Sequence, residues 1–275
     1  MAAELIAFVG GGQMAGSLIG GLLAAGHPAA RLRVAEPDAT RATALRGSHG
    51  IEVRASAREV ADGCDALVLA VKPQVMLEAL AGLAPTASTT VVSIAAGIRV
   101  DTLRAWLGPD APIIRSMPNT PALLRCGVTG LHAPAGTPEA SRQLAERILG
   151  AVGHTCWVAD ESLLDAITAV SGSGPAYYFL LTEALRDAGV ALGLDASVAK
   201  LLAERTLVGA GRMADGNVDV AQLRANVTSK GGTTEAAIAH LESHGVRQLF
   251  AAALKAAAER SRQLGTQPST SDTRH

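Results

Sequence analysis

Apolar residues are distributed differently in the two halves of this 275-residue chain. In the first half, short continuous apolar runs alternate with longer segments of helical pattern. The runs lie at residues 5–9, 32–35, 66–71 and 90–94, and shorter ones near 112–115, 128–132 and 155–158. Continuous apolar strands separated by helices are typical of a parallel sheet that helices cover on both faces. The pattern therefore predicts an α/β domain over residues 1–160.

After about residue 160 the strand signal stops. Many of the segments that follow have apolar residues on more than one face, and a helix of that kind needs several neighbours. We therefore expect an all-α domain over residues 161–265 that packs against a second copy of itself. Residues 266–275 are polar and are expected to form a disordered tail. The helical segments are 161–170, 175–192, 196–214, 219–226, 233–243 and 245–262.

Composition and charge exclude several classes of function. The chain is 48% hydrophobic, and its net charge is −1. Without a basic run, it is a poor candidate for binding nucleic acid or a membrane surface. Cys64, Cys126 and Cys156 have no metal-ligand spacing, so we expect reduced, inert thiols and no metal site. The first apolar run follows no basic segment and is too short to span a bilayer, which predicts a cytoplasmic protein.

A glycine cluster joins the first apolar run to the first helical segment. Residues 9–15, VGGGQMA, contain the spacing G-x-G-x-x-A. These glycines permit a tight turn and close approach to a pyrophosphate, which the helix N-terminus attracts. A simple strand-to-helix turn is the alternative. The position after the first strand favours a dinucleotide-binding Rossmann-like domain, with the cofactor on Gly10, Gly12, Gln13 and Met14.

The end of the second apolar run bears on the choice of cofactor. Glu36 lies where an acidic side chain bonds the adenine ribose 2′-hydroxyl, which favours NAD. However, Pro37 can turn that side chain away, and Arg41 is near enough to bind a 2′-phosphate. The sequence therefore predicts NADP(H) or NAD(H) and leaves the preference open.

Two later strand ends offer further cofactor contacts, because ligands of such folds bind at the carboxyl edge of the sheet. Val71, Lys72 and Pro73 follow the central strand, and Lys72 has the alternative of being a solvated lysine at a helix start. Ala95 and Ala96 follow the next strand, where small residues leave room for a nicotinamide ring.

A second glycine cluster interrupts the helical half, at residues 226–238, NVTSKGGTTEAAI. Two glycines let the chain curve around an anion, and the helix that follows directs its N-terminus at it. Backbone N–H groups and hydroxyls are supplied by Ser229, Gly231, Gly232, Thr233 and Thr234. The alternative is that one threonine merely caps the helix.

Two further motifs are RSMPNTP at residues 115–121 and SGSGPAY at residues 171–177. Together with GGGQMA, AVKP, SIAAG and VTSKGGTT, in this order from about residue 5 to 262, they resemble pyrroline-5-carboxylate reductase. The resemblance implies reduction of L-1-pyrroline-5-carboxylate to L-proline with NAD(P)H, the final step of proline biosynthesis. It also implies a homodimer of interleaved helices, often assembled into a decamer, with the active site between the nucleotide domain and the helical domains.

The resemblance also implies roles for individual residues. The loop at 229–234 would bind the substrate carboxylate, and Thr234 would lie near the ring nitrogen as proton donor or orienter. Met117 and Asn119 would shape the nicotinamide side of the pocket, contacting substrate and cofactor respectively. Lys230 departs from the usual TSPGG, because many members carry proline there. Since the binding groups are its neighbours, we expect Lys230→Pro to leave activity largely intact.

Two rival functions fit this sequence less well. A β-hydroxyacid dehydrogenase would carry a catalytic lysine in G-x-G-x-x-x-K, but Tyr178 occupies that position, and no lysine lies between Lys72 and Lys200. A non-catalytic nucleotide-binding protein would be expected to lose the second glycine loop, which is intact.

Overall fold

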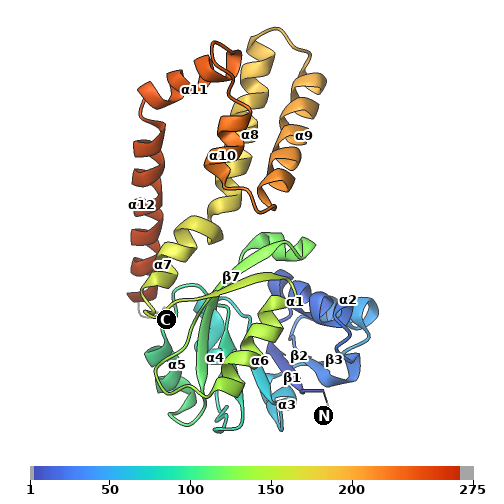
Figure 1. Ribbon diagram of the computed structural model, residues 1–275. Coiled ribbons are helices and arrows are strands. Elements are labelled where there is room, and N and C mark those ends of the chain that lie inside the picture. Colours follow the sequence, from blue (N-terminus) through green and yellow to red (C-terminus); the bar gives the residue numbers. More distant parts are fainter. Residues whose placement is uncertain (1–2, 267–275) are drawn as a thin grey trace, which may run out of the picture. The chain divides into compact units, whose positions relative to one another are not determined.

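The computed structural model of this chain describes residues 3–266 (Figure 1). The chain divides into two units, residues 1–172 with 257–275, and residues 173–256. The last helix, α12 (Val246–Thr266), begins in the second unit and ends in the first. The predicted domain boundary at residue 160 stays a prediction, and all but the first residue of the predicted tail lies outside the described residues.

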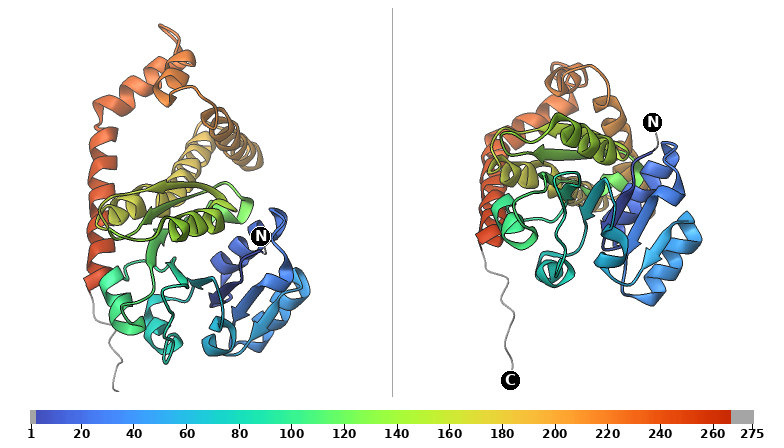
Figure 2. Two further views of the ribbon diagram at one scale, coloured as in Figure 1. Left: turned by 60° about the horizontal axis from the view of Figure 1, so that its bottom comes forward. Right: turned by 90° about the horizontal axis from the view of Figure 1, so that it is seen from below.

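The first unit is built on one eight-stranded sheet with the spatial order β3-β2-β1-β4-β5-β6-β7-β8. Figure 2 shows the first strands, in blue, toward one end of the sheet. Every apolar run of the sequence became a strand, whereas the three-residue edge strand β3 was missed. The bounds are β1 (Ile6–Val9), β2 (Leu32–Ala35), β3 (Glu52–Arg54), β4 (Ala66–Leu69), β5 (Thr90–Ser93), β6 (Ile113–Met117), β7 (Gly127–His132) and β8 (Gly153–Trp157).

One strand corrects the expectation of an all-parallel sheet. β7 pairs antiparallel with β6, whereas every other neighbouring pair is parallel. Only a short 3₁₀ segment, Thr120–Leu124, lies between the two strands. A parallel return needs a crossover of a dozen or more residues, so this short connection brings the chain back antiparallel.

Helices cover both faces of the sheet, as the sequence predicts. Alternate residues of β1 show how the two cores form, because side chains of a strand point to opposite faces in turn. Ile6 and Phe8 pack in the core under α1, α2 and α6, and Ala7 and Val9 in the core under α3, α4 and α5. The bounds are α1 (Gln13–Ala24), α2 (Ala39–His49), α3 (Ala57–Ala61), α4 (Pro73–Ala79), α5 (Val100–Leu107) and α6 (Glu139–Gly150).

The remaining helices follow the predicted segments closely. α7 (Leu163–Ile167) continues into a π-helical turn, Thr168–Gly172. In the second unit, α8 (Gly174–Ala191) and α9 (Ala196–Ala214) pack together, and a Cβ at Gly189 would lie 3.3 Å from the Cβ of Ala199. Their other faces leave large apolar side chains exposed in the single chain. α10 (Val220–Asn226) and α11 (Thr233–Ser243) complete the unit.

Candidate active site

The first glycine turn connects β1 to α1 and is held against buried neighbours. Gly10 has φ +100° and donates its N–H to the Ala35 carbonyl at 2.9 Å. A Cβ at this position would lie 2.7 Å from Val71 Cγ1 and 3.0 Å from the Ala70 backbone. Both the backbone conformation and the space therefore require glycine here.

The next two glycines differ from each other. Gly11 donates to Glu36 Oε2 at 3.1 Å, and a Cβ there would lie 2.5 Å from Leu45 Cδ1. Gly12 has φ −68°, and a Cβ on it would meet nothing within 4 Å. Packing inside the protein thus explains Gly11 but not Gly12. Gly12 leaves its side of the turn open to an approaching ligand.

The helix that follows this turn has the features of an anion site. Gly12 is the N-cap of α1 and makes no side-chain cap, and the first turn holds no acidic residue. The N–H groups of Gln13 and Met14 therefore have no partner among the described residues. Free N–H groups and the helix dipole suit a pyrophosphate. The predicted contacts at Gly10, Gly12, Gln13 and Met14 fit a dinucleotide.

Glu36 makes more hydrogen bonds within the protein than the sequence suggests. It is 5% exposed, and its Oε2 accepts from Gly11 while its Oε1 accepts from the Asp38 N–H at 2.9 Å. The Arg41 guanidinium lies 3.3 Å from the same Oε1, on a side chain that is 60% exposed. Glu36 therefore holds the first glycine turn in place. Its contact with a ribose stays a prediction, and Arg41 is the freer of the two charges.

The ends of β4 and β5 lie at the same edge of the sheet. Lys72 is the exposed N-cap of α4, makes no ion pair with any described residue, and precedes Pro73 at the first helical position. Val71 contacts the first glycine turn, as the space around Gly10 shows. Beyond β5, Ala95 is buried and Ala96 exposed. The cofactor roles of these residues stay predictions, but all of them adjoin the first glycine turn or the neighbouring strand.

Met117 and Asn119, from the motif that spans the end of β6, pack against the π-helical turn. Asn119 donates from Nδ2 to the Ser171 carbonyl at 3.1 Å, and its Oδ1 accepts from the Val128 N–H at 2.9 Å. A Cβ at Gly172 would lie 2.7 Å from Met117 Cε. Glycine at 172 thus makes room for Met117, and the Asn119 amide joins two segments of the first unit. Their predicted contacts with substrate and cofactor are not tested by this geometry.

Sequence reasoning missed an ion pair that joins three segments of the first unit. Arg115, 4% exposed, donates to Glu161 Oε1 at 3.0 Å. The same oxygen accepts from the Val100 N–H at 2.9 Å, at the start of α5. The partners are 46 and 61 residues apart. No periodicity of the sequence carries a signal for such a contact.

The end of α12 reaches the cofactor edge of the sheet. Ser261 donates to Asp165 Oδ1 at 2.6 Å, and both residues are buried. One turn later, a Cβ at Gly265 would lie 2.6 Å from the carbonyl oxygen of Gly97, a residue with φ +81°. The last turn of α12 therefore packs against the loop that follows Ala95 and Ala96.

The second glycine turn lies in the helical unit, between α10 and α11. Gly232 donates to the Ser229 carbonyl at 3.0 Å, and Gly231 has φ +73°. A four-residue turn with this bond and a positive φ at its third residue is a type II turn, which favours glycine there. A Cβ at Gly232 would lie 2.5 Å from Ser229 Oγ and 3.0 Å from the Ser229 carbonyl oxygen, so a larger residue there would push the serine hydroxyl aside.

This turn presents donors that the described chain does not use. Gly232 is the N-cap of α11 and makes no side-chain cap, so neither threonine caps the helix. The N–H groups of Thr233 and Thr234 are the first of the helix and have no helical partner. The hydroxyls of these threonines and of Ser229 bond no described residue. Two N–H groups and three hydroxyls at a helix N-terminus suit a carboxylate.

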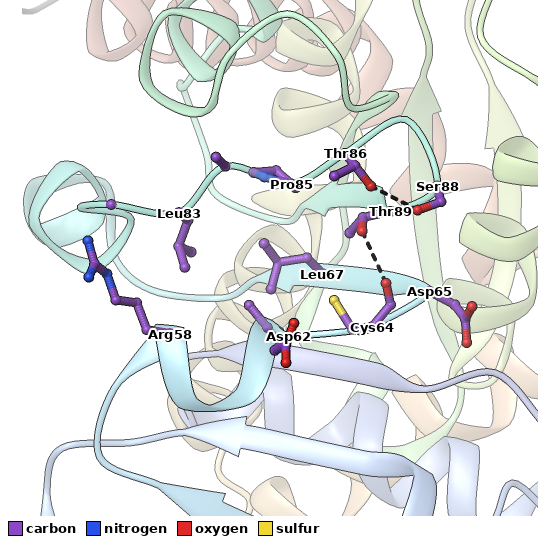
Figure 3. A pocket seen from close by; sticks show the side chains of 14 residues that line it. Arg58, Asp62, Cys64, Asp65, Leu67, Leu83, Pro85, Thr86, Ser88 and Thr89 are labelled. Atoms are coloured by element: carbon purple, nitrogen blue, oxygen red, sulfur yellow. Dashed lines mark hydrogen bonds between the residues drawn. The ribbon is translucent and has the colours of Figure 1, made fainter.

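A hollow of about 470 Å³ lies elsewhere, at the amino ends of β4 and β5 (Figure 3). Cys64 and Thr89 lie in its wall, and Thr89 Oγ1 donates to the Cys64 carbonyl at 3.1 Å. None of the residues that the motifs single out lines it. Among residues 3–266, no group of three or more His, Cys, Asp or Glu side chains could hold a metal, and no helix is long and apolar enough to cross a membrane.

Two family models match separate parts of the chain. The model described as pyrroline-5-carboxylate reductase dimerisation matches residues 161–264. The model described as NADP oxidoreductase coenzyme F420-dependent matches residues 5–97. The first match covers the helical half, and the second covers the part of the sheet that carries the first glycine turn.

Individual relatives match almost the whole chain. The pyrroline-5-carboxylate reductase of Pseudomonas aeruginosa is 47% identical over 270 residues, 97% of this chain and 99% of the relative. That of Haemophilus influenzae is 40% identical over 96% and 98%. A solved structure of a pyrroline-5-carboxylate reductase from Coxiella burnetii superposes with a TM-score of 0.90 at 40% identity, covering 97% and 100%. The Plasmodium falciparum pyrroline carboxylate reductase, solved with NADP bound, gives 0.82 at 29% identity, covering 97% and 100%.

Proposed function

This chain belongs to the pyrroline-5-carboxylate reductase family, and we propose that it reduces L-1-pyrroline-5-carboxylate to L-proline. The reaction adds a hydride to the C=N carbon and a proton to the nitrogen, so that pyrroline-5-carboxylate, NAD(P)H and H⁺ give proline and NAD(P)⁺. The chain is thus an NAD(P)H-dependent oxidoreductase of proline biosynthesis. The predicted family, fold and activity are confirmed.

The second glycine turn is the observation that carries the assignment of the substrate site. The substrate has a single carboxylate on a small ring, and it needs a compact set of donors. Ser229 Oγ and the N–H groups of Thr233 and Thr234 form such a set at the start of α11, where the helix dipole favours a negative charge. Backbone N–H groups and hydroxyls of this kind bind a carboxylate without a counter-charge from lysine or arginine.

The first glycine turn supports the cofactor site. The open face of Gly12 and the free N–H groups at the start of α1 fit the pyrophosphate of NAD(P)H. When bound, the reduced cofactor supplies the hydride that the imine carbon accepts. Arg41 and Glu36, at the end of β2, are the charged pair that we propose sets the preference between NADPH and NADH.

The protein's contribution to the chemistry is positioning rather than strong acid catalysis. A protonated imine already accepts hydride readily, so the chain needs to fix the ring and exclude water. We assign Thr234 the role of orienting the ring nitrogen through its hydroxyl, which bonds no described residue. The carboxylate bound to the turn fixes the ring carbon next to that nitrogen. Met117 and Asn119 are proposed to border the nicotinamide.

The helical half serves self-association. Residues 161–264 match the family's dimerisation model, and large apolar side chains on α8 are exposed in the single chain. Assembly beyond the dimer stays a prediction. The apolar side chains concerned are Tyr178, Phe179, Leu180, Leu181 and Leu185.

We also propose that the enzyme works in the cytoplasm, where NAD(P)H is regenerated. Cell fractionation with activity assays of each fraction tests this location. Activity confined to a membrane or exported fraction would contradict it.

The dehydrogenase alternative is not favoured. In this structure Tyr178, which occupies the position of its catalytic lysine, lies on α8 and is 62% exposed in the single chain. The reductase relatives, in contrast, match nearly all of this chain.

The test is imine-dependent oxidation of NAD(P)H by the purified chain, followed by the loss of absorbance of the reduced nicotinamide. Thr234→Val, which keeps the side-chain shape, should lower kcat roughly tenfold to a hundredfold, and Thr234→Ser should restore much of it. The dissociation constant of NADPH should not change. If the folded wild-type chain binds NADPH but does not oxidise it with pyrroline-5-carboxylate, the proposed function is wrong.

A further inference from the structure

The second glycine turn has an unusual source of rigidity. Its two central residues are Lys230 and Gly231, and neither fixes the backbone as a proline would. Within the single chain its surroundings do not fix it either, because Lys230 and Gly231 are exposed there and a Cβ at Gly231 would meet nothing within 4 Å. The closing bond from Gly232 to Ser229 is one constraint. A second constraint comes from the helix that follows.

Glu235 supplies that second constraint. It lies in the first turn of α11, and its Oε2 accepts from the Gly231 N–H at 2.7 Å. This is the only bond that its carboxylate makes among the described residues. The bond reaches back from the helix to the corner of the turn, where φ is positive. It therefore links the conformation of the turn to the start of the helix.

We propose that Glu235 is a positioning residue that holds the substrate turn in its binding conformation. This inference rests on the proposed function, because it concerns the site of the substrate carboxylate. The bond leaves the N–H groups of Thr233 and Thr234 and the hydroxyl of Ser229 free, and of the donors that the sequence predicts Glu235 occupies only the Gly231 N–H. It acts on these donors by holding the turn in a fixed position relative to the start of α11.

The type of turn also indicates which substitution could replace the constraint that Glu235 supplies. In a type II turn the second residue favours proline, because the ring presets the φ that this position needs. Here that residue is Lys230, whose N–H bonds no described residue, so proline at 230 removes no hydrogen bond. Proline at position 230 and the carboxylate at position 235 are then two independent ways to hold the same turn.

An opposing effect must be separated from this one. Glu235 places a negative charge near a site proposed to bind a carboxylate, and like charges repel. If repulsion dominates, removing the charge tightens substrate binding. If positioning dominates, removing the bond weakens it. Glu235→Gln separates the two effects, because its amide oxygen can still accept from Gly231 while the charge is gone.

The experiment compares the steady-state constants of four variants at saturating NADPH. Glu235→Ala should raise the KM for pyrroline-5-carboxylate about threefold to tenfold, the effect of one hydrogen bond of ordinary net strength on an equilibrium. Its kcat should change less. Glu235→Gln should restore the KM to within about twofold of wild type. Glu242→Ala is the matched control, because Glu242 lies on the same helix with its carboxylate paired to Arg247, and it should leave both constants unchanged.

The fourth variant, Lys230→Pro combined with Glu235→Ala, should regain most of the lost KM. A merely structural role of Glu235 would not respond to proline at the turn. The inference is overturned if Glu235→Ala leaves the KM unchanged or lowers it while the wild-type chain is active. It is also overturned if proline gives no recovery in a double variant with wild-type circular dichroism. An inactive wild-type chain would instead contradict the proposed function.

Discussion

In the first turn Gly10 and Gly11 lie against packed side chains of the sheet unit, whereas Gly231–Gly232 lies at the exposed start of a helix. Both turns contain a glycine with positive φ, and both open a helix whose first N–H groups are free. The first turn is fixed by Val71, Leu45 and the buried carboxylate of Glu36. The second is fixed by two local hydrogen bonds.

The difference separates two reasons for a glycine at a binding loop. At the first turn, glycine is required largely because the protein itself occupies the space beside it. At Gly12 and Gly231 the protein leaves the space open, so the requirement comes from the ligand or from the backbone conformation. Substitutions should therefore affect folding at one kind of position and binding at the other.

Gly10→Ala should have the largest effect. A Cβ would meet Val71 and the Ala70 backbone, and the residue would be held at φ +100°. We expect a loss of about 3 kcal/mol in the free energy of unfolding, from strain and overpacking together. Urea unfolding followed by circular dichroism measures it. Stability equal to that of wild type would mean that the first turn is not fixed by packing.

Gly265→Ala tests whether the cofactor edge depends on the end of α12. The new Cβ would lie 2.6 Å from the Gly97 carbonyl oxygen, and we expect a loss of about 2 kcal/mol in stability. The binding of NADPH should also weaken, because the loop at Ala95 and Ala96 must move. Gly150→Ala, at a helix position where a Cβ meets nothing within 4 Å, is the control and should be neutral or slightly stabilising. If the two variants were equally stable, the close packing of Gly265 on Gly97 would not contribute to stability as we expect.

Arg41→Ala sharpens the role of the charges beside the first turn. Arg41 is largely exposed and lies 3.3 Å from Glu36. Because arginine binds phosphate through charge-assisted bonds, the KM for NADPH should rise roughly fivefold to tenfold. The KM for NADH, which has no 2′-phosphate, should change little. The same rise for both cofactors would show that Arg41 acts through Glu36 and the turn.

The cysteines give the smallest expected effect. Cys64 lies at the amino edge of the sheet, opposite the edge that carries the first turn, and burial raises the pKa of its thiol to about 11. Since the thiolate is the reactive form, Cys64 stays protonated and unreactive at pH 8. Cys126 and Cys156 are exposed. Thiol titration at pH 8 should count two groups per folded chain and three after unfolding, with NADPH binding unchanged. A third group that reacts in the folded chain would contradict the burial of Cys64.

Most of the fold could be predicted from the sequence because nearly all of its strands are continuous apolar runs. β3 has no apolar run that would predict it, because only one of its three residues, Val53, is buried. The reversal at β7 depends on the length of one connection rather than on any strand pattern. The pair of Asp165 with Ser261 joins residues 96 positions apart, and nothing local marks either one.

The site was predictable to the level of loops. The glycine spacing located both turns, because glycine is selected by backbone conformation and close approach, which a sequence displays directly. What a side chain does there was less visible. Glu36 lies at the expected position, but its carboxylate accepts hydrogen bonds from Gly11 and Asp38 and pairs with Arg41. Glu235, three residues into a helix, gave no sign that it reaches back to Gly231.

The central claim is that the first turn binds the cofactor and the second binds the substrate carboxylate. Gly12→Ala and Gly231→Ala test it most directly, because neither new Cβ meets any atom within 4 Å. The measurement is the dissociation constant of NADPH, from its fluorescence, together with the KM for pyrroline-5-carboxylate. Gly12→Ala should weaken NADPH binding about tenfold and leave the KM within about twofold. Gly231→Ala should raise the KM about fivefold and leave NADPH binding unchanged. Two variants that alter the same constant, or that exchange these effects, would contradict the division between the turns.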